Sequence, residues 1–572
     1  MNGAKILAIL VVVLSTCFLA GESHSKVVIL FADGSLQAVI HESTKVENAG
    51  QYTIVHGDVT LQVDESDWLI APASSRNLEH PGPQGKFFEN RWGKFPAVGY
   101  TAVLKDIDGA GCAVIIEEFG EVPPLVSITK ESISVVKCAK LRLVPFQNGG
   151  YRSVARIYRD WMKEKGHYRH ILEKPFGREI AGAAAVRPVQ HGAISAEVWE
   201  KVQPIIPSAV MVWRQYGGPA EGMENFTLEL QEKLDRKGQY FFLPWGSLLA
   251  PVSQETTKSG MSYFGFSSMP SEMLEQWSWV GKDENFKHPK ASQGGGTGPT
   301  RFQSGLLCAH IQQERIRHWI DKVNKHPHSY RMDGVNIDST AALMRAQSYP
   351  GNCVHQEHPA SYKDWVDGVT EMFKVAYEKG LMISHEGCVF PLEKYVLHTY
   401  GKSMVSLGIY TGWYLKAEGE NKEPEKIINT IAEHVPVNEM IYHDQLALRI
   451  HDAEALNIRY ANPKQYRTNR QIKHVFNALY GLTPNLQLGG ADADRMILED
   501  LQWMKKEMPR ALQTYKKLYG LQLIDHRFLT EDHKIQKSVF EGGIAVIANF
   551  SDKNRVFDGT VVKALDYCLI EE

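Results

Sequence analysis

Two carboxylates follow strand-like apolar segments in the middle of the chain. Asp338 ends the segment 333–338, and Glu386 comes directly after the segment 381–385. Period-two alternation in a strand puts Asn336 and Asp338 on one face of the first segment. Glutamate is a poor strand residue, so a glutamate placed between an apolar strand and a glycine favours a functional role. Paired carboxyl groups hydrolyse glycosidic bonds, and we therefore predict Asp338 and Glu386 as catalytic residues.

Each carboxylate also has a structural explanation. Asp338 is in a position to cap the helix that follows it, although Ser339 and Thr340 can cap that helix instead. Glu386 can form an ion pair at the rim of the fold. Both explanations stay open at the level of sequence.

Other polar and aromatic side chains stand at or near the ends of predicted strands. Aromatic faces stack on the apolar side of a sugar ring, and polar groups hold its hydroxyls, although any one aromatic residue can instead belong to the core. The predicted substrate-binding residues are Trp213, Arg214, Trp245, Asp333, Asn336, His385, Tyr410, Trp413, His443 and Asp444.

The segment 177–520 has to position these residues. Apolar strands alternate there with longer helical segments, which is typical of a parallel sheet. Eight strands match a closed (β/α)8 TIM barrel, whose active residues lie at the carboxyl ends of the strands. A long insertion at 250–302 is expected to shape the substrate cleft. The predicted strands begin at Ile180, Ser208, Tyr240, Asp333, Leu381, Ser403, Glu439 and Leu482.

The barrel is predicted to be the centre of a multi-domain chain. Short alternating strands over 26–148 indicate an N-terminal β-sandwich, and 149–176 reads as a connecting helix. The last segment, 521–572, is again rich in strands and is predicted to form a small C-terminal β-sandwich.

Residues 1–25 have the pattern of a cleaved export signal, with Lys5 before an apolar run that ends at Ala20. The run is short for a membrane span, and no later segment is long and apolar enough for one, so we expect a secreted or periplasmic protein. Lipoprotein anchoring through Cys17 fits poorly because Thr16 precedes it. The sequence assigns no pairing to the other six cysteines.

Composition and motifs exclude several classes of function. The net charge is −3 without a basic cluster, so no nucleic-acid partner is predicted. The residues Cys353, His355 and His358 share one loop but match no zinc signature, and no catalytic metal is expected. Phosphate-binding, dinucleotide and serine-hydrolase motifs are also missing from the sequence, so no cofactor is predicted.

The order of these elements resembles that of a known family. The chain combines a sandwich, the helix YRSVARIYRDW, a barrel with DGVNIDSTAA and SHEGC, and a terminal sandwich. This order makes it similar to TIM-barrel glycoside hydrolases. These are the endo-α-N-acetylgalactosaminidases and related α-N-acetylgalactosaminidases, and more distantly the α-galactosidase superfamily. The resemblance implies a retaining mechanism with Asp338 as nucleophile and Glu386, 48 residues later (386 − 338 = 48), as acid/base. It also implies a carbohydrate substrate.

Two alternatives remain at this stage. An inverting glycosidase would use Asp444 or Asp333 in place of Asp338, with a wider separation between the two carboxyl groups. A carbohydrate-binding protein without catalysis would keep the aromatic residues and lose the carboxylates, yet both carboxylates are present. The sugar, the anomeric preference and exo against endo action do not follow from the sequence.

Overall fold

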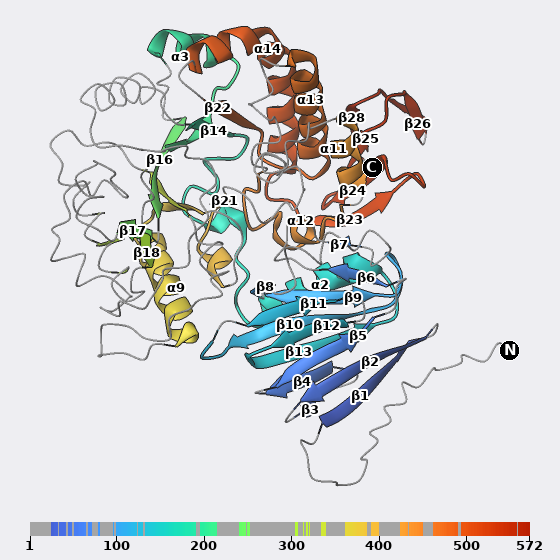
Figure 1. Cartoon of the computed structure of the whole chain (residues 1–572). Helices are drawn as coiled ribbons and strands as arrows, with labels where there is room; N and C mark the ends of the chain where they lie inside the picture. Colours follow the sequence, from blue (N-terminus) through green and yellow to red (C-terminus); the bar gives the residue numbers. More distant parts are fainter. Residues whose placement is uncertain are drawn as a thin grey trace. The chain divides into compact units, whose positions relative to one another are not determined.

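The structure is a computed structural model of the 572-residue chain, and it divides into two compact units (Figure 1). The amino-terminal unit comprises 1–164 with 344–351 and 361–363, and the carboxyl-terminal unit comprises the remainder. The residues that the structure describes are 24–31, 34–41, 44–47, 51–55, 57–63, 67–70, 78–79, 95–96, 99–122, 124–129, 132–189, 195–213, 239–247, 249–251, 304–306, 313, 316–317, 320, 333–338, 361–385, 391–399, 424–432, 434–449, 462–489, 493–557 and 559–571.

The amino-terminal unit consists mainly of two antiparallel sheets. The first has the order β1-β2-β5-β12-β11-β8 and the second β3-β4-β13-β10-β9-β6-β7. The strands of the first sheet are β1 His24–Phe31, β2 Gly34–His41, β5 Asp58–Gln62, β12 Ser132–Val136, β11 Leu125–Ile128 and β8 Phe95–Pro96. Those of the second are β3 Thr44–Glu47, β4 Gln51–Val55, β13 Cys138–Phe146, β10 Gly111–Phe119, β9 Tyr100–Leu104, β6 Trp68–Ile70 and β7 Leu78–Glu79.

Helix α2 (Gly150–Glu164) follows the second sheet and packs against it through a charged network. Glu117 of β10 lies 2.6 Å from Arg142 and 3.0 Å from Lys140, and accepts a 2.9 Å hydrogen bond from the Trp161 indole of α2. Burial opposes the charge on Glu117, but the hydrogen bond from Lys140 and the charge of Arg142 outweigh it and lower the pKa of this carboxyl. The network therefore joins the helix to two strands.

The carboxyl-terminal unit contains a seven-stranded parallel sheet of the order β21-β20-β19-β16-β15-β14-β22. Six of the eight predicted strands are confirmed at or close to their predicted positions. The strands are β14 Ala184–Val189, β15 Ala209–Trp213, β16 Tyr240–Ser247, β19 Gly334–Asp338, β20 Met382–His385, β21 His398–Thr399 and β22 Asn485–Gly489. The strand predicted from Ser403 lies outside the described residues, and β21 precedes it.

The prediction of a strand from Glu439 is wrong. Residues Val437–Tyr442 form helix α12, and all six are buried. A short run that is buried on every side shows no helical period, so periodicity cannot separate it from a strand. The segment 446–449 takes the place beside β21 instead: Ala447 forms a parallel bridge with His398, and the Leu448 carbonyl accepts a 2.7 Å hydrogen bond from the Thr483 amide.

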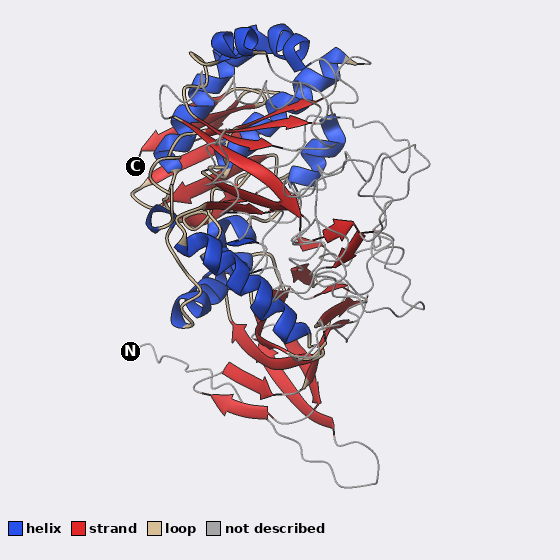
Figure 2. Cartoon of the chain, turned by 90° about the vertical axis from the view of Figure 1, so that its left-hand side faces the viewer, coloured by secondary structure: helices blue, strands red, loops and turns tan. Residues whose placement is uncertain are grey.

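Helices alternate with the strands of this sheet, as the sequence predicts, and Figure 2 distinguishes them by colour from the strands. The face of the sheet with Val186, Met211 and Phe242 packs against α3 and α14 in one apolar cluster. The alternate residues Val210, Phe241 and Leu243 belong to a second cluster on the other face. The helices are α3 Ala196–Val202, α9 Tyr362–Glu378, α11 Pro424–Ala432, α13 Pro463–Leu479 and α14 Ala493–Leu518. Within the described part of the chain, no helix is long and apolar enough to span a membrane.

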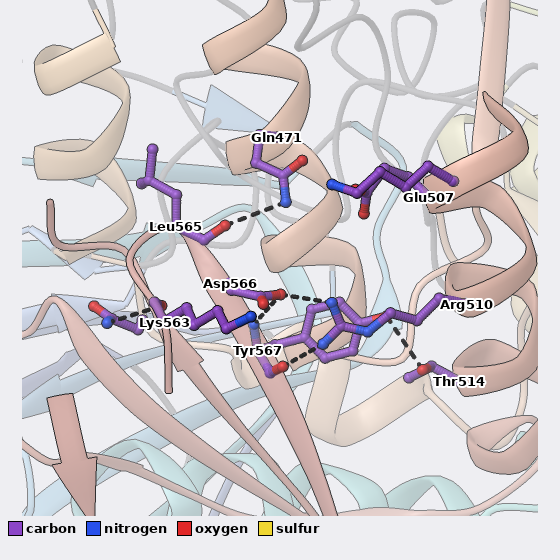
Figure 3. Close-up of polar contacts among 10 residues, drawn as sticks. Gln471, Glu507, Arg510, Thr514, Lys563, Leu565, Asp566 and Tyr567 are labelled. Atoms are coloured by element: carbon purple, nitrogen blue, oxygen red, sulfur yellow. Dashed lines mark hydrogen bonds and ion pairs between the residues drawn. The ribbon is translucent and has the colours of Figure 1, made fainter. Parts of the chain in front are cut away.

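A four-stranded antiparallel sheet, β23-β24-β25-β28, and the hairpin β26-β27 end the chain. Figure 3 shows how α13 and α14 hold it: Arg510 of α14 lies 2.7 Å from Asp566 and covers the Tyr567 ring, and Gln471 of α13 donates to the Leu565 carbonyl. The strands are β23 Leu523–Phe528, β24 Ile535–Phe540, β25 Ile544–Asn549, β26 Arg555–Phe557, β27 Thr560–Val562 and β28 Asp566–Glu571.

A buried lysine ties together segments on the amino-terminal side of the parallel strands. The Lys174 ammonium donates to the carbonyls of Glu393, Val396 and Gln445 at 2.6–2.8 Å, and the residue is 4% exposed. Its three donors therefore match three carbonyl acceptors that precede β21 and the segment 446–449. Burial lowers the pKa of Lys174 to about 7, against the opposing charge of the Glu393 carboxyl.

Replacing this lysine should destabilise the fold in a pH-dependent manner. Lys174→Met leaves three buried carbonyls without donors, and we expect a loss of about 3 kcal/mol in the free energy of unfolding. Because the native pKa lies below the ordinary value of 10.5, the native state releases its proton first. The stability of the native protein relative to the variant should then rise between pH 7 and about 10. Denaturant unfolding across this range measures both effects.

The matched control is Lys201→Met, which makes the same change at an exposed position of α3. It should leave the free energy of unfolding within roughly 0.5 kcal/mol of the native value at every pH. Equal effects of the two variants would contradict the anchoring role of Lys174.

Candidate functional site

The carboxyl ends of β19 and β20 lie side by side in a defined register. The parallel ladder pairs Asn336 with Ser384 and Ile337 with His385. In the sequence, Asp338 and Glu386 are the residues that come directly after this last pair. Asp338 is the last residue of β19, and its main chain pairs with Ser247 of β16. The Asp338 side chain and all of Glu386 lie outside the described residues.

Below this end of the ladder, three buried polar side chains form a hydrogen-bonded chain across β19, β20 and β21. The Ser384 hydroxyl donates to Asn336 Oδ1 at 2.8 Å and lies 3.1 Å from His398 Nδ1. All three residues are 0% exposed. Because the hydroxyl proton is directed to Asn336, His398 Nδ1 is the donor in the second hydrogen bond.

The electrostatic surroundings keep His398 neutral. Burial is the main cause that lowers its pKa well below 6.5, and the charge of Arg449 adds to the effect. Arg449 is 1% exposed and stands two residues after Ala447, at the end of the segment beside β21. A neutral imidazole with its proton on Nδ1 has a lone pair on Nε2, which makes that atom an acceptor.

Close packing brings the two strands together beneath this chain. A Cβ atom at Gly334 would overlap the Met382 carbonyl oxygen and the Leu243 side chain, so only glycine fits at this position. Leu243 and Met382 belong to the apolar cluster that fills the amino-terminal part of the same face. The polar chain thus begins where the apolar filling ends, toward the carboxyl ends of the strands.

The His385 side chain packs against helix α9. Its ring meets Phe373 of α9 edge to face, with centroids 6.0 Å apart, and it is 0% exposed. Neighbouring residues of a strand point to opposite faces, so His385 faces the helix while Ser384 faces the other side. These contacts do not test the substrate-binding role of His385, which stays a prediction.

Asp333 lies at the amino-terminal end of β19, directly before its first residue. Its Oδ2 accepts a 2.9 Å hydrogen bond from the Phe242 amide, and its own amide donates to the Phe242 carbonyl. The residue is 4% exposed. These bonds join the start of β19 to β16. They lie at the amino-terminal end of the sheet, which is not the expected substrate side.

His443 and Asp444 follow α12 and precede Ala447, so they too lie on the amino-terminal side. His443 is within 2.6 Å of the Leu521 carbonyl and 3.1 Å of the Gly481 carbonyl, and burial lowers its pKa. Asp444 accepts a 2.7 Å hydrogen bond from the Tyr168 hydroxyl. Their predicted substrate role depended on the strand at Glu439, which is absent from this part of the structure.

The structure describes less of the other predicted residues. Trp213 is the last residue of β15, and Trp245 lies in β16, where its main chain pairs with Asn336. The side chains of both tryptophans lie outside the described part. Outside it altogether are Arg214, Tyr410, Trp413, the loop with Cys353, and the insertion 250–302 beyond its first two residues.

Sequence reasoning missed Ser384, His398 and Arg449. A serine within an apolar strand has no distinctive chemistry, and its role emerges only from its cross-strand partners. His398 and Arg449 were missed because the sixth and seventh strands were predicted at other positions. Among the described residues, no group of three or more His, Cys, Asp or Glu side chains could hold a metal ion.

Comparisons with known proteins give matches at the level of structure. No protein-family model matches the sequence, and no curated protein matches it. The structure is similar to that of ligand-free α-N-acetylgalactosaminidase NagBb from Bifidobacterium bifidum, with a TM-score of 0.59, 12% identity, and coverage of 95% of this chain and 91% of that one. The GalNAc complex of NagBb matches with a TM-score of 0.60, 13% identity, and coverage of 98% and 92%. The chain therefore shares the fold of this glycosidase, in agreement with the resemblance found in the sequence.

Proposed function

We propose that the chain is a retaining glycoside hydrolase that cleaves O-glycosidic bonds, with Asp338 as nucleophile and Glu386 as acid/base. The observation that carries the proposal is the register of β19 and β20. The ladder pairs Asn336 with Ser384 and Ile337 with His385, and Asp338 and Glu386 each come directly after a member of the last pair. This register supports the proposal that the two carboxylates are neighbours.

The strand geometry fits the distance that a retaining enzyme needs. Neighbouring strands lie about 4.8 Å apart, and residues two apart along a strand share a face. Asp338 and Glu386 each come two residues after a member of the Asn336–Ser384 pair, so the alternation assigns them to one face. Retaining glycosidases hold their carboxyl groups about 5 to 5.5 Å apart, and inverting enzymes about 6.5 to 9.5 Å apart.

The inverting alternative loses support from the positions of its carboxylates. Asp333 is five residues before Asp338 on an extended strand, a separation of roughly 16 Å at about 3.3 Å per residue. Its carboxylate is already used by the Phe242 amide. Asp444 bonds to Tyr168 on the amino-terminal side of the sheet.

We further propose that the parallel sheet closes into an eight-stranded barrel through the segment 446–449. Ala447 bridges to β21 on one side, and Leu448 bonds to Thr483, just before β22, on the other. Since β22 is paired with β14, the first strand of the sheet, this segment supplies the missing position. In such a barrel the carboxyl ends of β19 and β20 form part of the active face.

The mechanism follows from these two carboxyl groups. Asp338 attacks the anomeric carbon while Glu386 protonates the departing oxygen, and Glu386 then takes a proton from the water that releases the sugar. No metal or other cofactor is needed for these steps. The shared fold with an α-N-acetylgalactosaminidase supports α-N-acetylgalactosaminides, or the related α-galactosides, as the substrate class.

Export is part of the proposal. Residues 1–25 would direct the chain out of the cytoplasm. Because β1 begins at His24 and pairs His24 with His41, cleavage between Gly21 and His24 leaves the whole ladder intact.

The mass of the protein recovered from the extracellular or periplasmic fraction tests this. We expect the mature chain to begin between Gly21 and Lys26, and a start at or before His24 keeps the whole β1–β2 ladder. Retention of residues 1–20 in the active protein would count against the export signal.

Loss of the nucleophile should abolish turnover. Asp338→Ala cannot form a covalent glycosyl-enzyme, so kcat on aryl glycosides should fall on the order of 10⁴-fold or more, even with excellent leaving groups. The control is Asp552→Ala, which removes an exposed aspartate and should leave kcat unchanged. Substantial turnover by Asp338→Ala would reject the assignment, and an inactive native protein that binds the sugar would favour the non-catalytic alternative.

The acid/base should behave differently from the nucleophile. An activated aryl glycoside needs little protonation to depart, so Glu386→Ala should still form the glycosyl-enzyme and then stall. Azide needs no base and should restore turnover, giving a glycosyl azide of retained configuration. The control Glu378→Ala removes an exposed glutamate of α9 and should show no azide effect. An azide product of inverted configuration would point to the inverting mechanism.

A further inference from the structure

We propose that Ser384 and His398 are positioning residues that set the separation of the two catalytic carboxylates. The proposal rests on the function proposed above. It assigns a role to two side chains that do not touch the substrate, since both are 0% exposed.

The first step is the place of the hydrogen bond between β19 and β20. Asn336 comes two residues before Asp338, and Ser384 comes two residues before Glu386. The 2.8 Å bond from Ser384 to Asn336 therefore joins the two strands one layer below the positions that the proposed function assigns to the two carboxylates. Side chains in successive layers of one face are roughly 6.6 Å apart, so any change in strand spacing here passes directly to the reacting groups.

His398 completes the constraint from β21. The Ser384 hydroxyl donates to Asn336 and accepts from His398 Nδ1, so both hydrogen bonds fix one rotamer of the serine. At this depth water does not compete for the bonds, and the low local dielectric strengthens them. Three neighbouring strands are thus fastened at one level.

The cost of this polar layer argues against a purely stabilising role. An apolar cluster with Leu243 and Met382 lies directly beneath it and shows that the interior can be filled without polar groups. Asn336 Nδ2 and His398 Nε2 have no hydrogen-bond partner in the described part of the chain, which is unfavourable in a buried site. Proteins keep unfavourable buried polar groups of this kind mainly at functional sites.

Kinetics of Ser384→Ala provide the first test. A displacement of about 1 Å at a reacting group costs up to 10²-fold in rate, so we expect kcat to fall about 10- to 100-fold while KM changes by less than about 3-fold. The matched control is Ser538→Ala, because Ser538 is also a 0% exposed serine within a strand, β24, but belongs to the C-terminal sheet. It should leave kcat unchanged.

A pair of substitutions at His398 isolates the hydrogen bond from the volume of the side chain. Asparagine places an N–H donor where Nδ1 stands, whereas leucine of nearly the same size and shape has none. We expect His398→Asn to keep most of the native kcat and His398→Leu to lose about as much as Ser384→Ala. Melting temperatures and circular dichroism of all variants establish that they are folded.

The decisive measurement is the dependence of kcat/KM on the leaving group, determined with a series of aryl glycosides of the sugar that the native enzyme hydrolyses. A misplaced Glu386 protonates poorly, so Ser384→Ala and His398→Leu should show a steeper loss of rate with poorer leaving groups, and His398→Asn a nearly native slope. A merely structural role would lower the melting temperature without changing the slope.

Native kcat and slope in Ser384→Ala and His398→Leu would overturn the positioning role, as would equal impairment of His398→Asn and His398→Leu. These outcomes are distinguishable from failure of the proposed function. An inactive Asp338→Ala together with a native-like Ser384→Ala removes only the positioning role, whereas an active Asp338→Ala, or a native protein that hydrolyses no aryl glycoside, removes both.

Discussion

The parallel register between β19 and β20 is the constraint on which the proposed site depends. Gly334 permits the close approach of the two strands, because a side chain there would overlap the Met382 carbonyl. From that contact the ladder runs without a break to Ile337 and His385. A slip of one residue would move every side chain of a strand to the opposite face. The same slip would turn Asn336 toward the helices and break its bond to Ser384, so packing and polarity specify one register together.

The groups that stabilise this sheet and the proposed catalytic groups belong to its opposite ends. On the amino-terminal side, Asp333 holds the amide of Phe242, and Lys174 holds three carbonyls ahead of β21 and the segment 446–449. The Lys174 ammonium and Oδ2 of Asp333 both bond to the main chain, which leaves these atoms poorly suited to bind a ligand. On the carboxyl-terminal side, the polar chain through Ser384 lies next to the positions at which we propose the catalytic carboxylates. This division agrees with the general organisation of parallel α/β barrels.

Periodicity predicted most of the fold but not every residue of the site. Helices α9, α13 and α14 and the strands β14 to β20 of the parallel sheet have either a clear helical period or a bounded apolar run, and all of these were found. The segment 437–442 is buried on every side and has no period, so it was taken for a strand, and His443 and Asp444 were placed at the wrong end. The orientation of His385 is a different case, because the bond between Asn336 and Ser384 places these two side chains on one face and His385 on the other. That pairing depends on the tertiary structure, and the sequence of one strand alone does not reveal it.

The same burial that makes His398 neutral also makes the positioning chain insensitive to pH. Its pKa lies well below 6.5, so the proton on Nδ1 and the direction of the bond to Ser384 do not change as a solution passes from neutral to mildly acidic. Serine and asparagine do not titrate in that range. An acid/base carboxyl, by contrast, has to gain and lose a proton in each catalytic cycle. In the proposed mechanism, a support made of groups with fixed protonation keeps the strand spacing constant while the acid/base carboxyl titrates. A charged histidine in the same place would couple the two events.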